Sequence, residues 1–274
     1  MIVYTCEDTF EAMMTCIYDA WASKEGHQNI RLKTEPIGTM ELFCEYRTVT
    51  SDPVKTRKVV RSIQQKISST AYLMVYRCAL SDHPDKLDRI YRFLLLGFAY
   101  PAQLTDMLQH PYVNAVFELN RKVMNEAHLF RECVRFQALP DGVLLAHIKP
   151  KSDILTLLYP AFDDRMPSEN WMIIDAIRRT AAIHPADAPT YLTTLSKEEF
   201  HRLSHVENQV DPFTDLWKSF FHQIEITQRH NPNCQRTHLP IWYRKHMTEF
   251  RLKKNLRRNG KPKVLFEKII IQRK

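Results

Sequence analysis

The chain has 274 residues, 39 Lys and Arg against 31 Asp and Glu, a net charge of +8 and 44% hydrophobic residues. This composition is typical of a folded globular protein, and the length allows one large domain or two small ones. No uncharged apolar run reaches the roughly 18 residues of a membrane-spanning helix, and the N-terminus lacks the pattern of a signal peptide.

Glycines and cysteines restrict the chemistry further. The five glycines are too widely spaced for a dinucleotide fingerprint, a Walker-type phosphate loop or a G-x-S-x-G nucleophile elbow. The six cysteines form no C-x-x-C pair, which argues against zinc ribbons, iron–sulfur clusters and a disulfide framework. We expect a cytoplasmic protein with reduced cysteines, no metal and no cofactor.

Residues 8–130 are expected to be mostly helical, after a short strand at residues 2–5. Apolar residues at helical spacing and start signals of the Asp-Pro and His-Pro type carry this prediction. Residues 24–38 are polar, contain Pro36 and Gly38, and are expected to form a loop. The expected helices begin at Asp8 or Thr9, at Asp52-Pro53, at Ala71, at His83-Pro84 and at His110-Pro111, the last of them ending at His128.

The hydrophobic period changes after residue 130. Alternating residues predict strands at 133–139 and 143–148, joined at Asp141-Gly142, a strong hairpin signal. A second hairpin is expected at 171–174 and 180–183, a strand at 191–195, and a short helix from 154 to 162. Further helices are expected after the capping box Ser196-x-x-Glu199, after Asp211-Pro212 and from Pro240 to Phe250, with a break at 231–233.

These elements predict an α+β fold in which a small antiparallel sheet packs against many helices. We expect a single domain over residues 1–250, helical at 8–130, sheet-rich at 131–195 and helical again at 196–250. A basic tail would follow at residues 251–274.

The positive charge is concentrated in that tail. Residues 251–274 contain ten Lys and Arg against Glu267 alone, a net charge of +9, whereas residues 1–250 sum to −1. A basic tail of this kind is typical of proteins that bind nucleic acid. A merely solubilising terminus and an anionic membrane surface are the alternatives.

Two constellations are candidates for function. Glu126 and His128, with Arg135 beyond them, could form a general acid–base site, provided that the helix ends at His128, since residues two apart on a helix diverge. The plainer alternative is a helix end whose dipole His128 complements.

The second constellation surrounds an expected helix start at Pro240. Helix starts and guanidinium groups bind phosphate, and aromatic rings stack on bases. The predicted nucleic-acid contacts are Arg229, Asn231, Arg236, Tyr243, Lys245, Arg257 and Arg258. Alternatively, the aromatic residues belong to the core and the basic residues are only solvated.

Two weaker patterns point to metals. His201 and His205 are spaced i, i+4 on an expected helix, without the glutamate of a metalloprotease or an evident third ligand. Asp163-Asp164 and Asp175 could hold a divalent ion, but such acids are commonly surface residues. We expect no metal site at either.

Several strings, in order over residues 1 to about 250, resemble a bacterial family described as DNA repair or DNA metabolism proteins of unestablished activity. The strings are Tyr4 with Thr9-Phe10-Glu11, Lys66-Ile67-Ser68, Ile90-Tyr91, Phe93-Leu94, Leu96-Gly97-Phe98, Glu126-Ala127-His128, Arg135-Phe136, Asp141-Gly142, Ile154-Leu155, Leu157-Leu158, Trp171-Met172-Ile173-Ile174-Asp175, Leu216-Trp217-Lys218, Phe220-Phe221, Glu225-Ile226, Pro240 and Tyr243.

The resemblance implies a DNA partner and a second protein. In that family the gene typically lies beside one for a radical-SAM protein suspected of modifying or repairing DNA, and some members carry a fused uracil-DNA-glycosylase-like domain. The 24 residues after position 250 cannot contain that domain. The chain departs from the family pattern at His147, where a Glu is usual, at Ser152, where a His is usual, and around Tyr243, where the basic and tryptophan positions are exchanged.

The sequence therefore predicts a protein that binds or processes DNA together with a radical-SAM partner and does not bind a membrane. A non-catalytic adaptor that presents DNA to the partner is the alternative, and the sequence does not decide whether the chain is an enzyme.

Overall fold

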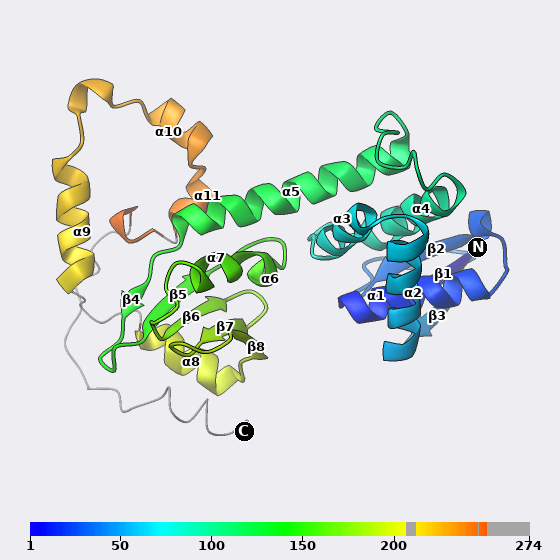
Figure 1. Ribbon diagram of the computed structural model, residues 1–274, viewed down its shortest axis with the longest axis horizontal. Coiled ribbons are helices and arrows are strands. Elements are labelled where there is room, and N and C mark those ends of the chain that lie inside the picture. The colour runs from blue at the N-terminus through cyan, green and yellow to red at the C-terminus, as the bar shows by residue number, and fades with distance from the viewer. Residues whose placement is uncertain (207–211, 246, 251–274) are drawn as a thin grey trace. The chain divides into compact units, whose positions relative to one another are not determined.

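A computed structural model describes residues 1–206, 212–245 and 247–250. The fold is α+β, as predicted, with a three-stranded parallel sheet and a five-stranded mixed sheet (Figure 1). None of the helices in these ranges has the length and apolar character needed to cross a membrane. The chain divides into two compact units. The single domain expected over residues 1–250 stays a prediction.

Unit 1 comprises Met1–Asn125 and Lys151–Asp153. Three strands and four complete helices, together with most of α5, make up this unit. In chain order they are β1 (Ile2–Cys6), α1 (Phe10–Ala22), the short 3-10 helix η1 (His27–Asn29), β2 (Ile30–Thr34), β3 (Glu45–Val49), α2 (Pro53–Lys66), α3 (Ser69–Ala79), α4 (Lys86–Ala99) and α5 (Pro111–Cys133), which continues into unit 2.

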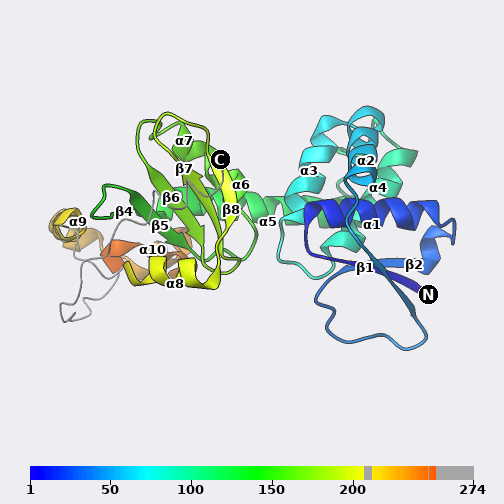
Figure 2. The same ribbon diagram turned by 90° about the horizontal axis from the view of Figure 1, so that it is seen from below.

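The parallel sheet has the order β2-β1-β3, so the N-terminal strand is its centre. Ile2 pairs with Ile30 on one side and with Glu45 on the other. Helix α1, whose start is capped by the Thr9 hydroxyl, packs against β1 and α2 (Figure 2). The expectation of a loop over residues 24–38 was wrong at β2. Its pattern I-R-L-K-T buries only Ile30 and Leu32, and three polar residues in five hid the strand.

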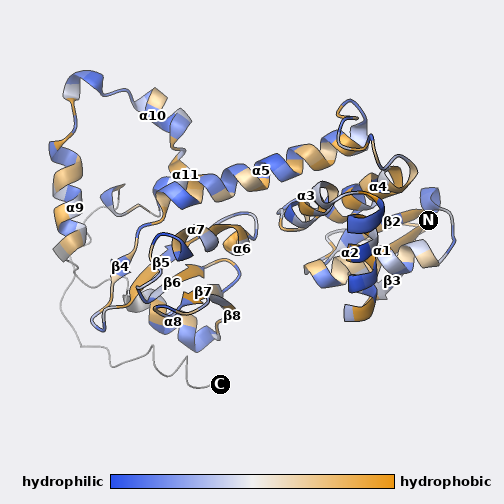
Figure 3. Cartoon of the chain, in the orientation of Figure 1, coloured by the Kyte–Doolittle hydropathy of each residue, from blue (hydrophilic) through white to orange (hydrophobic). Residues whose placement is uncertain are grey.

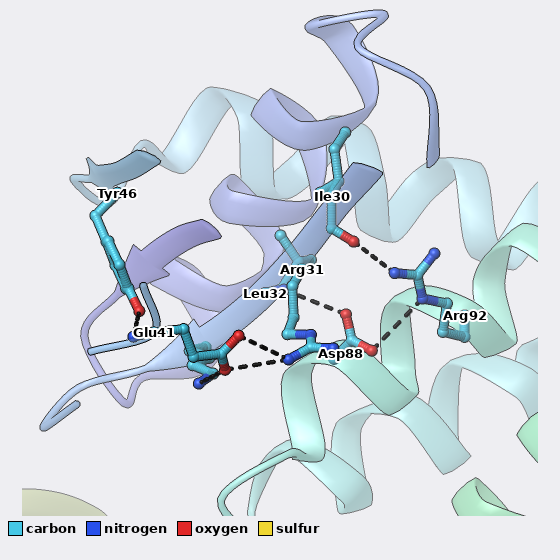
Figure 4. Close-up of polar contacts among 8 residues, drawn as sticks. Ile30, Arg31, Leu32, Glu41, Tyr46, Asp88 and Arg92 are labelled. Atoms are coloured by element: carbon cyan, nitrogen blue, oxygen red, sulfur yellow. Dashed lines mark hydrogen bonds and ion pairs between the residues drawn. The ribbon is translucent and has the colours of Figure 1, made fainter. Parts of the chain in front are cut away.

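Side chains of α4 cover the outer edge of β2 (Figure 4). Asp88 accepts a hydrogen bond from the Leu32 backbone N–H, and Arg92 donates to the carbonyl of Ile30. Asp88 and Arg92 also pair with each other along the helix. An open strand edge invites pairing with other chains, and these two side chains block it.

The loop between β2 and β3 is held by one carboxylate. Glu41 pairs with Arg31 and with Lys33 of β2, at 3.0 and 2.7 Å, and its backbone N–H donates to the hydroxyl of Tyr46 (Figure 4). The hydrogen bond from Lys33 is the main reason why the pKa of Glu41 is lowered. The loop therefore has a fixed base although its apolar tip is exposed.

Unit 2 comprises Glu126–Pro150 and the chain from Ile154 onward. It contains the end of α5, five strands and several short helices. They are β4 (Gln137–Ala138), β5 (Leu144–Ile148), α6 (Leu155–Leu158), α7 (Pro160–Asp163), β6 (Trp171–Asp175), β7 (Thr180–His184), β8 (Tyr191–Thr194), α8 (Lys197–Val206), α9 (Pro212–Gln223), η2 (Thr227–Arg229), α10 (Pro232–His238), α11 (Ile241–Arg244) and η3 (Thr248–Phe250).

The second sheet has the order β4-β5-β6-β7-β8 and is antiparallel except for the pair β5–β6. Both predicted hairpins are confirmed, and Gly142, with φ +86°, provides the left-handed turn between β4 and β5. All five residues of β6 are buried, which is typical of a central strand. The predicted capping box also forms, because Ser196 and Glu199 exchange backbone-to-side-chain hydrogen bonds.

Three predicted boundaries were wrong. Helix α5 does not end at His128 but continues to Cys133, which leaves β4 with only two residues. Asn231-Pro232 starts α10 rather than only breaking a helix, since the Asn231 side chain caps it. The helix expected from Pro240 to Phe250 is the four-residue α11 followed by η3.

Candidate functional site

The last turns of α5 carry a buried carboxyl group. Glu126 is 5% exposed, although it is charged, because it lies on the same face of α5 as the core residues Val123 and Phe130. The spacing i−3 and i+4 puts all three on one stripe of a helix. A carboxyl group on that stripe needs polar partners in place of water.

Tyr243 of α11 is the ionisable neighbour of Glu126. Its ring packs edge-to-face on Phe130 with the centroids 5.0 Å apart. Burial, and then the negative charges of Glu126 and Cys133, raise the pKa of Tyr243 to about 12. Glu126 and Tyr243, which the sequence placed in two separate constellations, therefore belong to one cluster in unit 2.

Arg135 and Glu249 form the second polar pair of this cluster. Arg135 donates to Glu249 at 2.9 Å, and the side chain of Glu249 is only 1% exposed. Burial alone would raise the pKa of Glu249, but hydrogen bonds from its own backbone N–H, Arg135 and Trp217 together lower it. The Arg135 guanidinium also lies 5.8 Å from the ring centre of Trp217. This ion pair joins the end of α5 to the segment around η3.

His128 does not join Glu126. Its side chain is 65% exposed and lies 3.2 Å from Glu132, one turn further along α5. Because the helix continues past His128, the side chains at 126 and 128 point to different sides of it. The predicted acid–base pair thus lacks the convergence on which it depended, and a catalytic role for Glu126, His128 and Arg135 stays a prediction.

Two cations lie over aromatic rings in the stretch from Trp242 to Phe250. Lys245 is exposed, with its amino group 4.7 Å from the ring centre of Trp242. Arg244 lies 5.1 Å from the ring centre of Phe250 and donates to the carbonyl of Leu239. Tyr243 is half-buried against Phe130, so its stacking surface is engaged within the protein, and among the residues of this stretch that the structure describes, Lys245 alone is exposed.

The other predicted nucleic-acid contacts lie just before this stretch. Arg229 in η2 and Arg236 in α10 are exposed, and neither forms an ion pair with another described residue. The side chain of Asn231 accepts a hydrogen bond from the Cys234 N–H at 3.0 Å, so it closes the start of α10. Arg257 and Arg258 lie outside the described residues.

Two of the three carboxylates that the sequence singled out for metals, Asp163 and Asp175, have structural partners. Asp163 accepts a hydrogen bond from Thr190 and pairs with His184, while Asp175 accepts from the backbone N–H groups of Ile177 and Arg178. Within residues 1–206, 212–245 and 247–250, no three His, Cys, Asp or Glu side chains come close enough together to hold a metal ion. His201 is exposed, and the side chain of His205 lies outside the described part.

Sequence reasoning missed Glu249 and Trp217. Both are distant in sequence from Arg135, and no spacing rule links them to it. The burial of Glu126 could have been predicted from the sequence, because the helical period of α5 places position 126 on the apolar stripe.

Comparison with known proteins identifies a family whose profile matches this chain. The sequence profile of a family described as a domain of unknown function, DUF4130, matches residues 84–249. No curated protein matches the chain. No solved structure matches it either.

Proposed function

This chain belongs to the DUF4130 family, a family of domains of unknown function, and from that premise we propose that it binds DNA and presents it to a radical-SAM enzyme. The proposal rests on the charge and the aromatic residues of unit 2, and on the resemblance of the sequence to DNA repair proteins that are encoded beside such an enzyme.

The observation that carries the proposal is the separation of charge along unit 2. Residues 126–225 hold 10 basic and 15 acidic residues, a net charge of −5. Residues 226–250 hold four basic residues and one acidic residue, a net charge of +3, and the tail adds +9. Basic side chains gathered in one part of a chain are what a phosphate backbone attracts.

The described basic residues are also placed to make contacts. Arg229, Arg236 and Lys245 are exposed on consecutive short elements, η2, α10 and the end of α11. Lys245 lies over Trp242, which supports a surface where a cation and a ring together meet a base or sugar. Phosphate contacts of this kind position the DNA without reading its sequence.

A division of labour with the partner follows from the cysteines. A radical-SAM enzyme needs an iron–sulfur cluster held by clustered thiolates. The cysteines of this chain are scattered in sequence, and Cys6, Cys16, Cys78 and Cys133 are buried in the two cores. The proposal therefore gives the radical chemistry to the partner and DNA binding to this chain.

A second candidate function is catalysis by the cluster at the end of α5. The buried Glu126 and the half-buried Tyr243 favour it, since ionisable groups kept from water are suited to proton transfer. Arg135 would position the cluster through Glu249, whereas His128 lies on another side of α5 and pairs with Glu132.

DNA binding is tested by its salt dependence. We expect the double variant Arg229→Ala, Arg236→Ala to lower the slope of log affinity against log salt by about 0.9 for each duplex phosphate that the protein no longer neutralises. Removal of residues 251–274 should lower the same slope by several times this amount, because the tail carries ten basic residues. Arg121→Ala is the matched control, because Arg121 is an exposed arginine of unit 1 that pairs with Glu118. Unchanged slopes in both test proteins would overturn the proposal.

Catalysis is tested separately, with the full chain and the purified radical-SAM partner. Glu126→Gln and Tyr243→Phe should abolish the change in DNA mass produced by the pair if this chain is an enzyme, and should spare DNA binding. If turnover stays at the parental rate in both folded variants, the adaptor function stands and the catalytic one does not.

A further inference from the structure

Helix α9 has one apolar face packed and another left open. Its first side, Trp217 and Phe221, meets η3, where the Phe221 and Phe250 rings lie 5.6 Å apart. The adjacent side is exposed: Leu216 by 67%, Ile224 by 55% and Phe220 by 50%. We call these three residues the open face of α9.

The open face is continuous. The two spacings of four residues place the three side chains within one stripe of a helix. Ile224 follows the last residue of α9 and continues its turn, because its N–H donates to the carbonyl of Phe220. Hydrophobic residues recur along α9 in Figure 3, and polar residues occupy the opposite side. Three large neighbouring apolar side chains in water are costly, at about 25 cal/mol for each Å² exposed, so such a stripe marks a surface that something covers.

The chain itself supplies an apolar segment of matching character. Residues 251–263 contain seven basic residues and no acidic residue. Residues 264–271 then change character abruptly: Val264, Leu265, Phe266, Ile269, Ile270 and Ile271 are apolar, and the two charges between them, Glu267 and Lys268, cancel. Phosphate contacts are made by basic and polar groups, so they do not explain why six of these eight residues are large and apolar.

The attachment point puts this segment within reach of α9. Phe250, which immediately precedes the basic stretch, contacts Phe221 of α9. The 13 residues from 251 to 263 can span up to about 45 Å, whereas a 12-residue helix is only about 18 Å long. The local concentration of a segment tethered in this way is in the millimolar range, which favours it over an occupant from solution.

We propose that residues 264–271 cover the open face of α9 within the same molecule. The basic stretch 251–263 is then tethered at both ends beside residues 226–250, which places the positive charges of the chain together. The proposal does not rest on DNA binding, because its contacts are apolar and involve none of the basic residues.

The test is hydrogen–deuterium exchange of the full-length protein, read by mass spectrometry over residues 212–224. Leu265→Ser, Phe266→Ser and Ile270→Ser combined should speed exchange in α9 by roughly tenfold, the effect of losing about 1.4 kcal/mol. Lys263→Ser, Lys268→Ser and Lys274→Ser combined is the matched control and should leave α9 exchange unchanged.

A second measurement identifies the occupant. A photo-crosslinking phenylalanine at position 266 should label residues 212–224 within one chain, at a yield independent of protein concentration. A yield that rises with concentration would make a second copy the occupant and overturn the proposal. Equal α9 exchange in the apolar variant and the parent would also overturn it.

Discussion

The two units use charged residues differently. In residues 1–125, the 15 basic and 14 acidic residues nearly balance, and pairs such as Arg31–Glu41 and Arg92–Asp88 join separate elements or turns. In unit 2 the net charge is negative over residues 126–225 and positive from residue 226 onward. Opposite charges are therefore mixed in unit 1, whereas in unit 2 the excess of each sign lies in a different part of the chain.

The largest effects should come from the two apolar cores. Phe93→Ala in unit 1 and Trp171→Ala in unit 2 should each lower the free energy of unfolding by about 3–5 kcal/mol, since both side chains are fully buried. Urea unfolding followed at several probes measures this loss. A single domain over residues 1–250 requires one shared transition in both variants, and two transitions of which each variant shifts only one would contradict it.

Next comes the ion pair between Arg135 and Glu249. Arg135→Met should lower the free energy of unfolding by about 3 kcal/mol at pH 7, because it leaves the carboxylate of Glu249 buried and unpaired. Arg121→Met, which removes an exposed ion pair of unit 1, should cost about 0–1 kcal/mol. Equal losses in the two variants would refute this contrast between buried and exposed pairs.

The pH dependence of the same pair has a definite sign. The pKa of Glu249 is lowered in the folded protein, so its contribution to stability is complete above the ordinary carboxyl pKa of about 4.3 and is lost as the pH falls through the folded value. Arg135→Met should lack this acid-side loss, and acidification toward pH 5 should stabilise it instead. Urea midpoints at several pH values measure the difference.

A smaller effect concerns Tyr243. Its pKa of about 12 is raised mainly by burial and then by Glu126, so stability should fall as the pH rises above the unfolded value of about 10. Glu126→Gln should lower the pKa of Tyr243 without returning it to 10. The ultraviolet difference between parent and Tyr243→Phe follows this phenol, and His128→Gln is the control that should not change it.

The smallest expected effect concerns the ion pairs of Glu41, which hold the loop between β2 and β3 in unit 1. Glu41→Gln should speed cleavage by chymotrypsin after Leu42 or Phe43 at pH 7, since the ion pairs with Arg31 and Lys33 no longer hold the loop. In the parent the pKa of Glu41 is lowered, so acidification through that value should release the loop as well. Glu45→Gln, which removes the pair with Arg47, should leave the cleavage rate unchanged.

Local signals in the sequence predicted most elements, because caps and turns act over a few residues. Thr9, Asp52 and Ser196 begin helices as expected, and Asp141-Gly142 forms its turn. The parallel sheet was missed, because β2 and β3 are half-exposed and owe their pairing to β1, far away in sequence.

The same limit applies to the candidate site. The helical period of α5 places position 126 on the apolar stripe, but the sequence carried no signal that the helix continues to Cys133. Because it does continue, the side chain of His128 points away from that of Glu126. The partnership of Arg135 with Glu249 joins residues 114 positions apart, which no local pattern reports.

The central place of β1 has a consequence for the order of folding. Ile2 must find Ile30 and Glu45, which lie 28 and 43 positions later, before the sheet of unit 1 exists. At about 5–20 residues per second, a ribosome makes the first strand several seconds before its second neighbour. The residues of β1 are thus synthesised before both of their strand partners, and contacts of such long sequence separation should make the sheet slower to form than the helices around it.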